Sequence, residues 1–388
     1  MHFKLPAFYQ QRPYAAENFT RIIRWAARNH PFYRQHFKDC AGNIPLLSRE
    51  DILNNNELLL NGRQETGRTS GSTGTPVRFA WSAQRQKISS DENQQYTNHW
   101  LGGALPRSRI IRTHGSEGSD TLDIEAPIDE QIEFLCMRFR DHGAVSVITY
   151  PTNAAELASQ AISKDIDFSF IRRFSCYAEA FEPWQEQMVK RAFPEAKIWT
   201  TYSATELGMI AARCPYEPNY HHVFARKLGV EIIDDHGNDC APGELGRVVV
   251  TDYFNQLTPF IRYDIGDMAE HAECPCGKIP FPALTNIAGK VRGMLRDAYG
   301  NKVMFSHLDA ALRDVPGMGQ FQVIQHKLQE FELRYVPAKE FNQPVFEPAA
   351  FELFSRQFGK DINLHFTQEK VIARGANGKF YASICHVE

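Results

Sequence analysis

Residues 146–206 read SVITYPTNAAELASQAISKDIDFSFIRRFSCYAEAFEPWQEQMVKRAFPEAKIWTTYSATE. Three short runs rich in β-branched and aromatic residues, at 146–150, 170–177 and 196–202, alternate with two stretches that have the pattern of helices. Helices of about a dozen residues between strands are the crossovers that a parallel sheet needs. The stretch therefore predicts a β-α-β-α-β unit and an α/β fold.

Polar residues follow two of these predicted strands. Tyr177, Ala178 and Glu179 come after the second strand, and the run YSATE at 202–206 follows the third. Ligands of open parallel sheets bind at the carboxyl ends of the strands. These two segments are therefore the first candidates for a binding site.

The residues before this unit are expected to be largely helical. Apolar residues within 16–30 recur on one helical face, and Ser48 followed by Asp51 is typical of a helix cap. After the unit, residues 230–254 contain two β-rich runs around a turn-rich connection, which predicts an antiparallel hairpin.

Past Gly289 the chain returns to short alternating strands and helices, among them QFQVIQH at 320–326 and EFELRYV at 330–336. We therefore predict two domains. Residues 1–288 would form a large N-terminal domain with parallel α/β sheets and a β-rich subdomain, and residues 289–388 a small, mobile α+β domain.

The composition of the chain argues against two classes of binding partner. The chain has 388 residues, 43% of them hydrophobic, and a formal net charge of −3. Acidic and basic residues are mixed throughout, so no basic stripe predicts binding to nucleic acid or to a membrane surface. The N-terminus lacks the apolar core of a signal peptide, and we expect a cytoplasmic protein. Eight cysteines in so long a chain favour a reducing compartment over a disulfide framework.

A glycine- and hydroxyl-rich loop, TSGSTGTP at 69–76, precedes the parallel unit. Such a loop can surround a phosphate with backbone N–H and hydroxyl donors. It lacks the lysine of the common nucleotide-binding loop, because Gly74 is followed by Thr75, Pro76 and Val77. Taken alone, the loop is a different phosphate site or an ordinary surface turn.

Five segments in order resemble the adenylate-forming enzymes, the acyl-CoA synthetase and adenylation-domain superfamily. They are TSGSTGTP at 69–76, YSATE at 202–206, RYDIGD at 262–267, GK at 289–290 and GK at 378–379. Within that superfamily the chain is most similar to the phenylacetate–CoA ligase and capsular-polysaccharide-type branch. Segments that carry this likeness are HPFYRQHF at 30–37, IPLLSREDI at 44–52, GELGRVVVTD at 243–252 and CPCGK at 274–278.

The resemblance implies roles for residues that bind ATP and Mg²⁺. The residues that would hold the β- and γ-phosphates are Thr69, Ser70, Gly71, Ser72, Thr73, Gly74 and Thr75. Thr205 would bond the α-phosphate beside Ser203, and Glu206 would hold Mg²⁺. Tyr202 would lie against adenine, with Ala178 and Glu179 on its other face.

The same likeness extends to the ribose and to the carboxylate. Asp267 would bind the ribose, since one carboxylate can accept from two vicinal hydroxyls, although a turn aspartate is the plainer interpretation. Lys290 stands where the family usually has arginine. Lys379 would bridge the substrate carboxylate and the α-phosphate, whereas a lysine on a terminal turn is by default only solvated. The hinge departs from the family with Arg292 and Gly293, and the swing between two domain poses therefore rests on the flexibility of Gly293.

Aromatic side chains near the strand ends suggest the substrate. His114, Tyr150 and Tyr177 are candidates for the acid pocket and favour a flat or aromatic acid, although aromatic residues at strand ends often belong to the core.

The cysteines suggest a metal. Cys214, Cys274 and Cys276, with either His221 or His222, would make a closed structural zinc site. The alternative is that the cysteines are buried thiols. Spacing leaves the choice of histidine open, because neighbours on a strand face opposite ways.

The expected activity is ATP-dependent conversion of a small carboxylic acid, aromatic by the residues above, to an acyl-adenylate and then to a thioester, with CoA as the acceptor that the resemblance implies. A carrier-protein pantetheine and an amine remain alternatives, as does a nucleotide-binding protein that has lost catalysis. The sequence leaves the oligomeric state open, a homodimer included.

Overall fold

The computed structural model describes residues 3–38, 40, 42–69, 75–113, 118–179, 181–290, 294–303, 305–338, 341–375 and 378–387. Among the residues predicted above to be functional, Ser70, Gly71, Ser72, Thr73, Gly74 and His114 lie outside these ranges, as do Arg292 and Gly293 of the hinge. Lys290 is described by its backbone alone.

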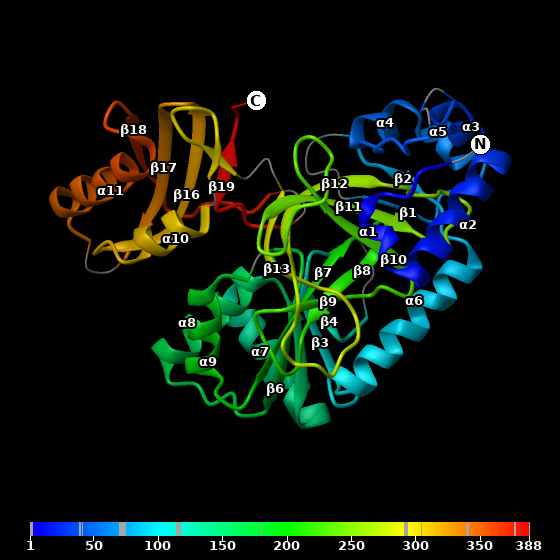
Figure 1. Cartoon of the computed structure of the whole chain (residues 1–388). Coiled ribbons are helices and arrows are strands. Elements are labelled where there is room, and N and C mark those ends of the chain that lie inside the picture. The colour runs from blue at the N-terminus through cyan, green and yellow to red at the C-terminus, as the bar shows by residue number, and fades with distance from the viewer. Residues whose placement is uncertain are drawn as a thin grey trace.

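Most helices lie in the first two hundred residues (Figure 1). They are α1 (Ala7–Gln10), α2 (Pro13–Asn29), α3 (Pro31–His36), α4 (Arg49–Asn54), α5 (Asn56–Leu60), α6 (Ala83–Gln95), the π-helical turn η1 (Tyr96–Trp100), α7 (Ile128–His142), α8 (Pro151–Lys164), α9 (Pro183–Ala192), α10 (Phe305–Arg313) and α11 (Gln343–Phe358). The predicted helix within 16–30 is confirmed as α2, and Ser48 and Asp51 form the predicted capping box of α4.

The strands before residue 300 are β1 (Gly67–Arg68), β2 (Arg78–Phe79), β3 (Arg107–Ile111), β4 (Thr121–Asp123), β5 (Val145–Thr149), β6 (Ile171–Cys176), β7 (Lys197–Ala204), β8 (Gly208–Arg213), β9 (His221–Val223), β10 (Leu228–Ile233), β11 (Leu245–Asp252), β12 (Tyr263–Ala272), β13 (Ala283–Lys290) and β14 (Leu295–Arg296). Those after it are β15 (Lys302–Val303), β16 (Met318–Lys327), β17 (Glu330–Pro337), β18 (Asn363–Gln368) and β19 (Ser383–Cys385).

One 11-stranded sheet organises the larger part of the chain, in the order β10-β11-β12-β13-β9-β8-β7-β6-β5-β3-β4. Strands β4, β3, β5, β6 and β7 are mutually parallel, as the β-α-β-α-β unit predicts. From β7 to β10 all pairings are antiparallel, and the predicted hairpin is β10–β11. The parallel and β-rich regions therefore share one continuous sheet.

Strand β7 joins the two halves. Its residues 197–200 pair in parallel with β6, and residues 201–204 pair antiparallel with β8. The β7–β8 turn, which contains Thr205 and Glu206, therefore lies at the change from parallel to antiparallel pairing.

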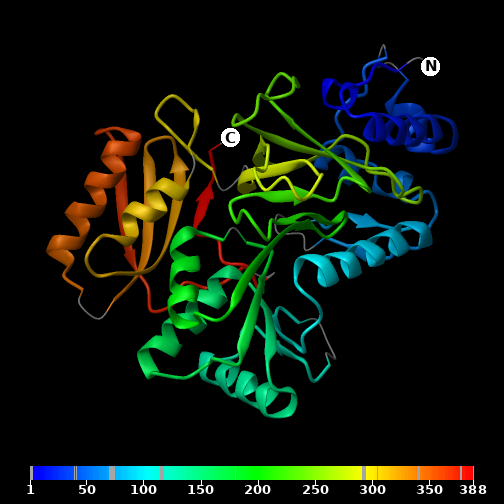
Figure 2. The same cartoon turned by 60° about the horizontal axis from the view of Figure 1, so that its bottom comes forward.

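Separate apolar cores support the two halves of the sheet. Helices α7, α8 and α9 pack on the parallel half, while the N-terminal helices pack on the antiparallel half. Figure 2 shows the same arrangement from below, with α6 running beside the sheet. No helix in the described ranges combines the length and the apolar composition that crossing a bilayer requires.

The C-terminal part has its own sheet and core. Its strands follow the order β18-β17-β16-β19, and α10 and α11 pack against them around Phe331, Phe346 and Phe354. The chain then leaves β18, contacts the larger part and returns to form β19 beside β16 (Figures 1 and 2). The division at residue 288 remains a prediction.

Candidate functional site

The candidate site lies at the carboxyl ends of β5, β6 and β7. Because these strands are parallel and adjacent, the segments that follow them leave the sheet at one edge. Tyr150 follows β5, Tyr177, Ala178 and Glu179 follow β6, and the end of β7 contains Tyr202 and Ser203.

Two of the predicted nucleotide residues are hydrogen-bonded to each other. The Tyr202 hydroxyl donates to Asp267 Oδ2 at 2.8 Å. Burial and the Asp267 carboxylate raise the pKa of Tyr202 far above its ordinary value, so the phenol stays neutral and keeps donating. Asp267 on β12 lies opposite Lys290 on β13. The predicted adenine contact and the predicted ribose acceptor thus form one unit.

Hydrogen bonds to both the backbone and the side chain of Glu206 hold the β7–β8 turn. Trp81 Nε1 donates to the Glu206 carbonyl at 2.8 Å, and the Tyr263 hydroxyl donates to Glu206 Oε1 at 3.1 Å. Glu206 is buried, whereas Thr205 beside it is exposed. The turn therefore presents a hydroxyl to solvent next to a fixed carboxylate, an oxygen ligand of the kind that Mg²⁺ prefers.

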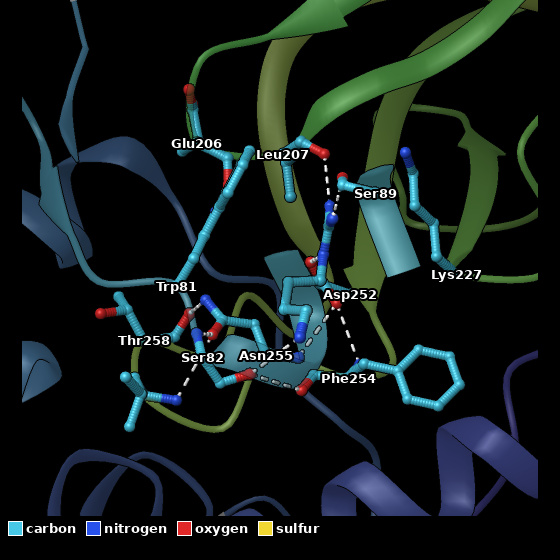
Figure 3. A network of polar contacts seen from close by, with 12 residues as sticks. Trp81, Ser82, Ser89, Glu206, Leu207, Lys227, Asp252, Phe254, Asn255 and Thr258 are labelled. Atoms are coloured by element: carbon cyan, nitrogen blue, oxygen red, sulfur yellow. Dashed lines mark hydrogen bonds and ion pairs between the residues drawn. The ribbon is translucent and has the colours of Figure 1, made fainter. Parts of the chain in front are cut away.

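A buried ion pair secures this turn from the other side. Arg85 on α6 pairs with Asp252 at the end of β11, and both side chains are fully buried. Arg85 Nη2 also donates to the Leu207 carbonyl at 2.6 Å, and Asp252 Oδ1 accepts from the Phe254 and Asn255 N–H groups. Figure 3 shows this network, with Ser89 and Leu207 on the side of the guanidinium and Phe254 and Asn255 beside Asp252.

We expect Arg85→Met to lower the free energy of unfolding by about 3–5 kcal/mol, because it leaves the Asp252 carboxylate buried without its charge partner. The Leu207 carbonyl also loses its donor. Urea unfolding measures the change. The matched control is Lys87→Ala on the same helix, whose exposed pair with Asp91 should contribute about 0.5 kcal/mol or less. Equal effects of the two substitutions would contradict the assignment.

Residues on either side of the glycine-rich loop form a short hairpin. Strands β1 and β2 pair as a hairpin, and beyond them Thr69 N–H donates to the Val77 carbonyl while Val77 N–H donates to Thr69 Oγ1 at 3.0 Å. Thr69 thus uses its hydroxyl oxygen as an acceptor within the hairpin and retains one O–H donor. Arg49 Nη2 donates to the Thr75 carbonyl at 3.1 Å.

The segment after β6 has a strained backbone. Ala178 has a φ of 73°, which costs a non-glycine residue roughly 1 kcal/mol. The Glu179 carboxylate accepts hydrogen bonds from the Thr152 hydroxyl and the Phe380 N–H. The structure therefore gives this carboxylate contacts that the sequence analysis did not expect.

The predicted acid-pocket residues Tyr150 and Tyr177 are in contact. Their rings lie edge to face with centroids 5.5 Å apart, and Tyr150 is buried. Burial raises the pKa of both tyrosines. Both also pack against the apolar core of the parallel half, so they belong to the core as well as to the strand ends.

Lys379 lies at the same edge of the sheet. Its neighbour Gly378 has a φ of 75°, and a Cβ built there would be 3.0 Å from Arg112 Cβ and 3.4 Å from a Tyr150 ring carbon. The turn that contains Lys379 thus packs directly on the segments after β3 and β5.

Four predicted metal ligands converge in a second cluster. The donor atoms of Cys214, His222, Cys274 and Cys276 all lie within 4.8 Å of one another. His221 is not among them, because its Nε2 is 2.7 Å from Thr200 Oγ1. The register of β9 thereby resolves the choice that spacing left open.

Two of the donor separations match the edges expected around a tetrahedral zinc ion. Bonds of about 2.3 Å to sulfur and about 2.0–2.1 Å to nitrogen give tetrahedral edges of about 3.8 Å (S to S) and about 3.6 Å (S to N). Cys274 Sγ lies 3.8 Å from Cys214 Sγ, and Cys276 Sγ lies 3.6 Å from His222 Nε2. His222 Nδ1 lies 3.0 Å from the Phe281 carbonyl, the second contact that fixes a ligating imidazole.

Several residues of the site were missed by sequence reasoning. Trp81, Arg85 and Tyr263 hold the Glu206 turn, and Arg374 contacts the segment after β6. The position of Tyr263 within RYDIGD was a usable signal. The other contacts join residues more than a hundred positions apart, which no local pattern reveals.

Comparison with solved structures defines the class of fold. The chain superposes on 2-hydroxyisobutyryl-CoA ligase in the postadenylation state, in complex with 2-HIB-AMP, with a TM-score of 0.76 and 17% identity, over 99% of this chain and 91% of that one. It also resembles ATP-bound MatB from Rhodopseudomonas palustris (TM-score 0.57, 13% identity, 81% and 65% covered). A third similar structure is the amide bond synthetase McbA from Marinactinospora thermotolerans (0.58, 17%, 80% and 66%). The chain therefore has the fold of the adenylate-forming ligases, which confirms the predicted fold class.

The C-terminal part matches one particular family model. Residues 295–385 match the family model of the CapK C-terminal domain, in agreement with the likeness to the capsular-polysaccharide-type branch. No curated protein matches the chain.

The arrangement of the two parts also resembles one particular state. Against 2-hydroxyisobutyryl-CoA ligase with 2-HIB-AMP and CoA in the thioesterification state, the TM-score falls to 0.61 at the same identity and coverage. The present arrangement is closer to the postadenylation state.

Proposed function

We propose that this chain is an ATP- and Mg²⁺-dependent ligase that converts a small carboxylic acid into its acyl-adenylate and then passes the acyl group to a thiol, with CoA as the first candidate. The observation that carries the proposal is the meeting of the Lys379 turn with the strand ends that bear Tyr150 and Glu179. A cation delivered there can face both a carboxylate and the α-phosphate of ATP.

Each candidate residue would have a separate role in the reaction, set by its chemistry. The substrate carboxylate attacks the α-phosphorus of ATP, and pyrophosphate leaves, so negative charge must be neutralised on both sides of phosphorus. Thr205 would donate to the α-phosphate, Glu206 would hold Mg²⁺ beside it, and Lys379 would face the carboxylate. Tyr202 and Asp267 would hold the nucleoside, with Lys290 nearby on β13.

Mg²⁺ would neutralise the departing pyrophosphate. Glu206 is suited to hold it because its carboxylate is buried and oriented by Tyr263, and its backbone is fixed by Trp81. The residues of the loop from Ser70 to Gly74 would complete the phosphate contacts, as the sequence likeness implies.

Tyr177, whose ring lies edge to face with the buried Tyr150 and is itself only partly buried, favours a small aromatic acid, because a flat ring could pack against it. The acceptor remains a separate question. Among the similar structures are CoA ligases and an amide bond synthetase, so CoA, a carrier-protein pantetheine and an amine should all be offered.

We also propose that Cys214, His222, Cys274 and Cys276 hold a structural zinc ion. All four ligand positions would be filled by the protein, which leaves none open for substrate. The cluster joins the segment after β8 to β9 and to the β12–β13 connection, so its role would be to stabilise the antiparallel half of the sheet.

Pyrophosphate exchange tests the activity. We expect an aryl or arylacetic acid to promote exchange of labelled pyrophosphate into ATP, with AMP and no ADP as the nucleotide product, and CoA to yield the thioester. Omission of acid or of Mg²⁺ is the control. Tight ATP binding without exchange for any acid in a panel of aryl, arylacetic and aliphatic acids would count for the nucleotide-binding alternative. A preference for a long-chain acid would overturn the pocket assignment.

A further inference from the structure

The segment between β18 and β19 contacts its own domain at both ends, through Ile372 and Tyr381, and is anchored between them to the larger part of the chain. Arg374 Nη1 donates to Thr152 Oγ1 at 2.7 Å, and Arg374 Nη2 donates to Glu156 Oε1 at 3.1 Å. Arg374 Nη1 also lies 3.6 Å from Glu179 Oε1. One guanidinium therefore contacts two residues of α8 and the carboxylate after β6.

The Glu179 carboxylate completes this contact from the other side. Its Oε2 accepts from the Thr152 N–H and hydroxyl at 3.1 and 2.7 Å, and its Oε1 accepts from the Phe380 N–H at 2.7 Å. Thr152 stands in the first turn of α8, where backbone N–H groups lack helical partners and the helix dipole favours an anion. Glu179 is therefore held by α8 and in turn holds Phe380.

Burial makes these contacts specific. Only 6% of the Glu179 side chain and 10% of the Arg374 side chain is exposed. Burial raises the pKa of Glu179, which shows that its charge depends on the Phe380 N–H, Arg374 and Thr152 for compensation. Such a carboxylate is poorly suited to reach outward to a ligand.

Lys379 stands between two anchored neighbours. On one side Gly378 packs closely against Arg112 and Tyr150 with a positive φ that favours glycine, and on the other side Phe380 is held by Glu179. The Lys379 carbonyl accepts from the Gly375 N–H at 2.8 Å, which closes the turn. The backbone of Lys379 is thereby fixed relative to the strand ends.

We propose that Arg374, Glu179, Thr152 and Glu156 form an interdomain clamp that positions Lys379 for adenylate formation. This inference rests on the proposed function and deepens it, because it assigns Arg374 and Glu179 as positioning residues that act through the Lys379 turn. Neither needs to touch the substrate. Glu179 is thereby given a task different from the adenine contact that the sequence likeness implied.

The clamp also distinguishes the two domain arrangements. It is closed in the present arrangement, which is closer to the postadenylation state of 2-hydroxyisobutyryl-CoA ligase than to its thioesterification state. For the small domain to take the second arrangement, the clamp must open. Opening it by mutation should therefore impair adenylation and spare the second half-reaction.

The test combines hydrogen exchange with the two half-reactions, in the full-length protein. We expect Arg374→Ala to speed amide exchange at Phe380 by about tenfold or more without changing exchange in the core strands β16 and β17. We expect its kcat for pyrophosphate exchange to fall by about 10- to 100-fold, because a displaced Lys379 lowers the rate while the KM for ATP stays within about threefold. Thioester formation from supplied acyl-adenylate and CoA should be unchanged or faster.

Two further variants provide the comparison. Arg374→Lys keeps the charge but loses the fork that reaches Thr152 and Glu156 together, so it should give an intermediate loss. Lys302→Ala removes an exposed interdomain pair with Asp235 that does not touch the 371–381 segment, and it should leave both half-reactions within about twofold.

The outcomes separate the two ideas. Unchanged exchange at Phe380 in Arg374→Ala would overturn the clamp, whatever the activity. Equal loss of both half-reactions, or an equal loss in Lys302→Ala, would also overturn it. If the wild-type protein forms no adenylate from any acid, the proposed function fails, while exchange at Phe380 still decides whether the clamp exists.

Discussion

Replacing Lys379 by alanine is expected to lower the rate of acyl-adenylate formation by roughly 10²- to 10³-fold, the usual loss when one preorganised group that stabilises developing charge is removed. The side chain is half-buried on a turn, so the free energy of unfolding should fall by about 1 kcal/mol, the typical cost of a single substitution. The KM for ATP should change little, because Thr205, Glu206 and Asp267 would still bind the nucleotide. Pyrophosphate exchange at varied ATP measures both parameters.

Lys370→Ala is the matched control. Lys370 is exposed on the same segment, before the contacts of Arg374 begin, and its loss should leave the rate within about twofold. An exchange rate that is indifferent to Lys379→Ala would show that the lysine is misassigned. A loss of pyrophosphate exchange in Lys379→Ala but not in Lys370→Ala would exclude the alternative that the protein binds nucleotide without catalysing a reaction.

The part of the parallel sheet from β5 to β7 could be predicted because its signals are local, whereas β3 and β4 were not predicted. Each of the three strands is a short run with β-branched or aromatic residues, helices α8 and α9 each start at a proline, and the alternation itself implies parallel pairing. The antiparallel partner β8 lies beside the same strand β7 that ends the unit. Its pairing follows from the tight turn at 205–207, which the sequence analysis considered only as a phosphate and metal contact.

Helix α6 shows why some elements were missed. Its buried residues are Arg85, Ser89 and Glu92, which recur on one helical face but are polar. A search for apolar periodicity finds no buried face in such a helix. The burial depends on Asp252 at the end of β11 and on Lys227 in the turn before β10, so the signal exists only in the folded chain.

The residues of the candidate site also fall into two groups, those that a motif predicts and those that only the folded chain reveals. Residues that the family likeness supplies, such as Tyr202 and Asp267, were predicted by motif, and the structure adds that they are hydrogen-bonded. The clamp residue Arg374 belongs to no motif, and its partners Thr152, Glu156 and Glu179 lie roughly two hundred residues away. The three cysteines and one histidine of the proposed zinc site were predicted as a set, but only the register of β9 shows that His222, not His221, lies with the cysteines.

Removing the zinc ligands is expected to have the largest effect on stability. Zinc binding in structural sites is worth on the order of 10 kcal/mol, and much of it is folding free energy. The purified protein should contain about one zinc per chain. Cys274→Ser combined with Cys276→Ser should abolish zinc binding and lower the melting temperature, since Cys214, on the segment after β8, would no longer be tied to the β12–β13 connection. A metal-free wild type whose melting temperature ignores the double substitution would leave the cysteines as packing residues.

The two adjacent histidines offer a control within the same strand. His222→Ala should lose the metal because it removes Nε2, which lies 3.6 Å from Cys276 Sγ, whereas His221→Ala should retain about one zinc because His221 contacts Thr200 instead. Both substitutions truncate a largely buried imidazole, so both lose packing and only the metal content separates them. Elemental analysis of protein purified without chelator gives that readout directly. Retention of zinc in His222→Ala with loss in His221→Ala would reverse the register of the site, and loss in both would show that the strand, not the ligand, is what the substitutions disturb.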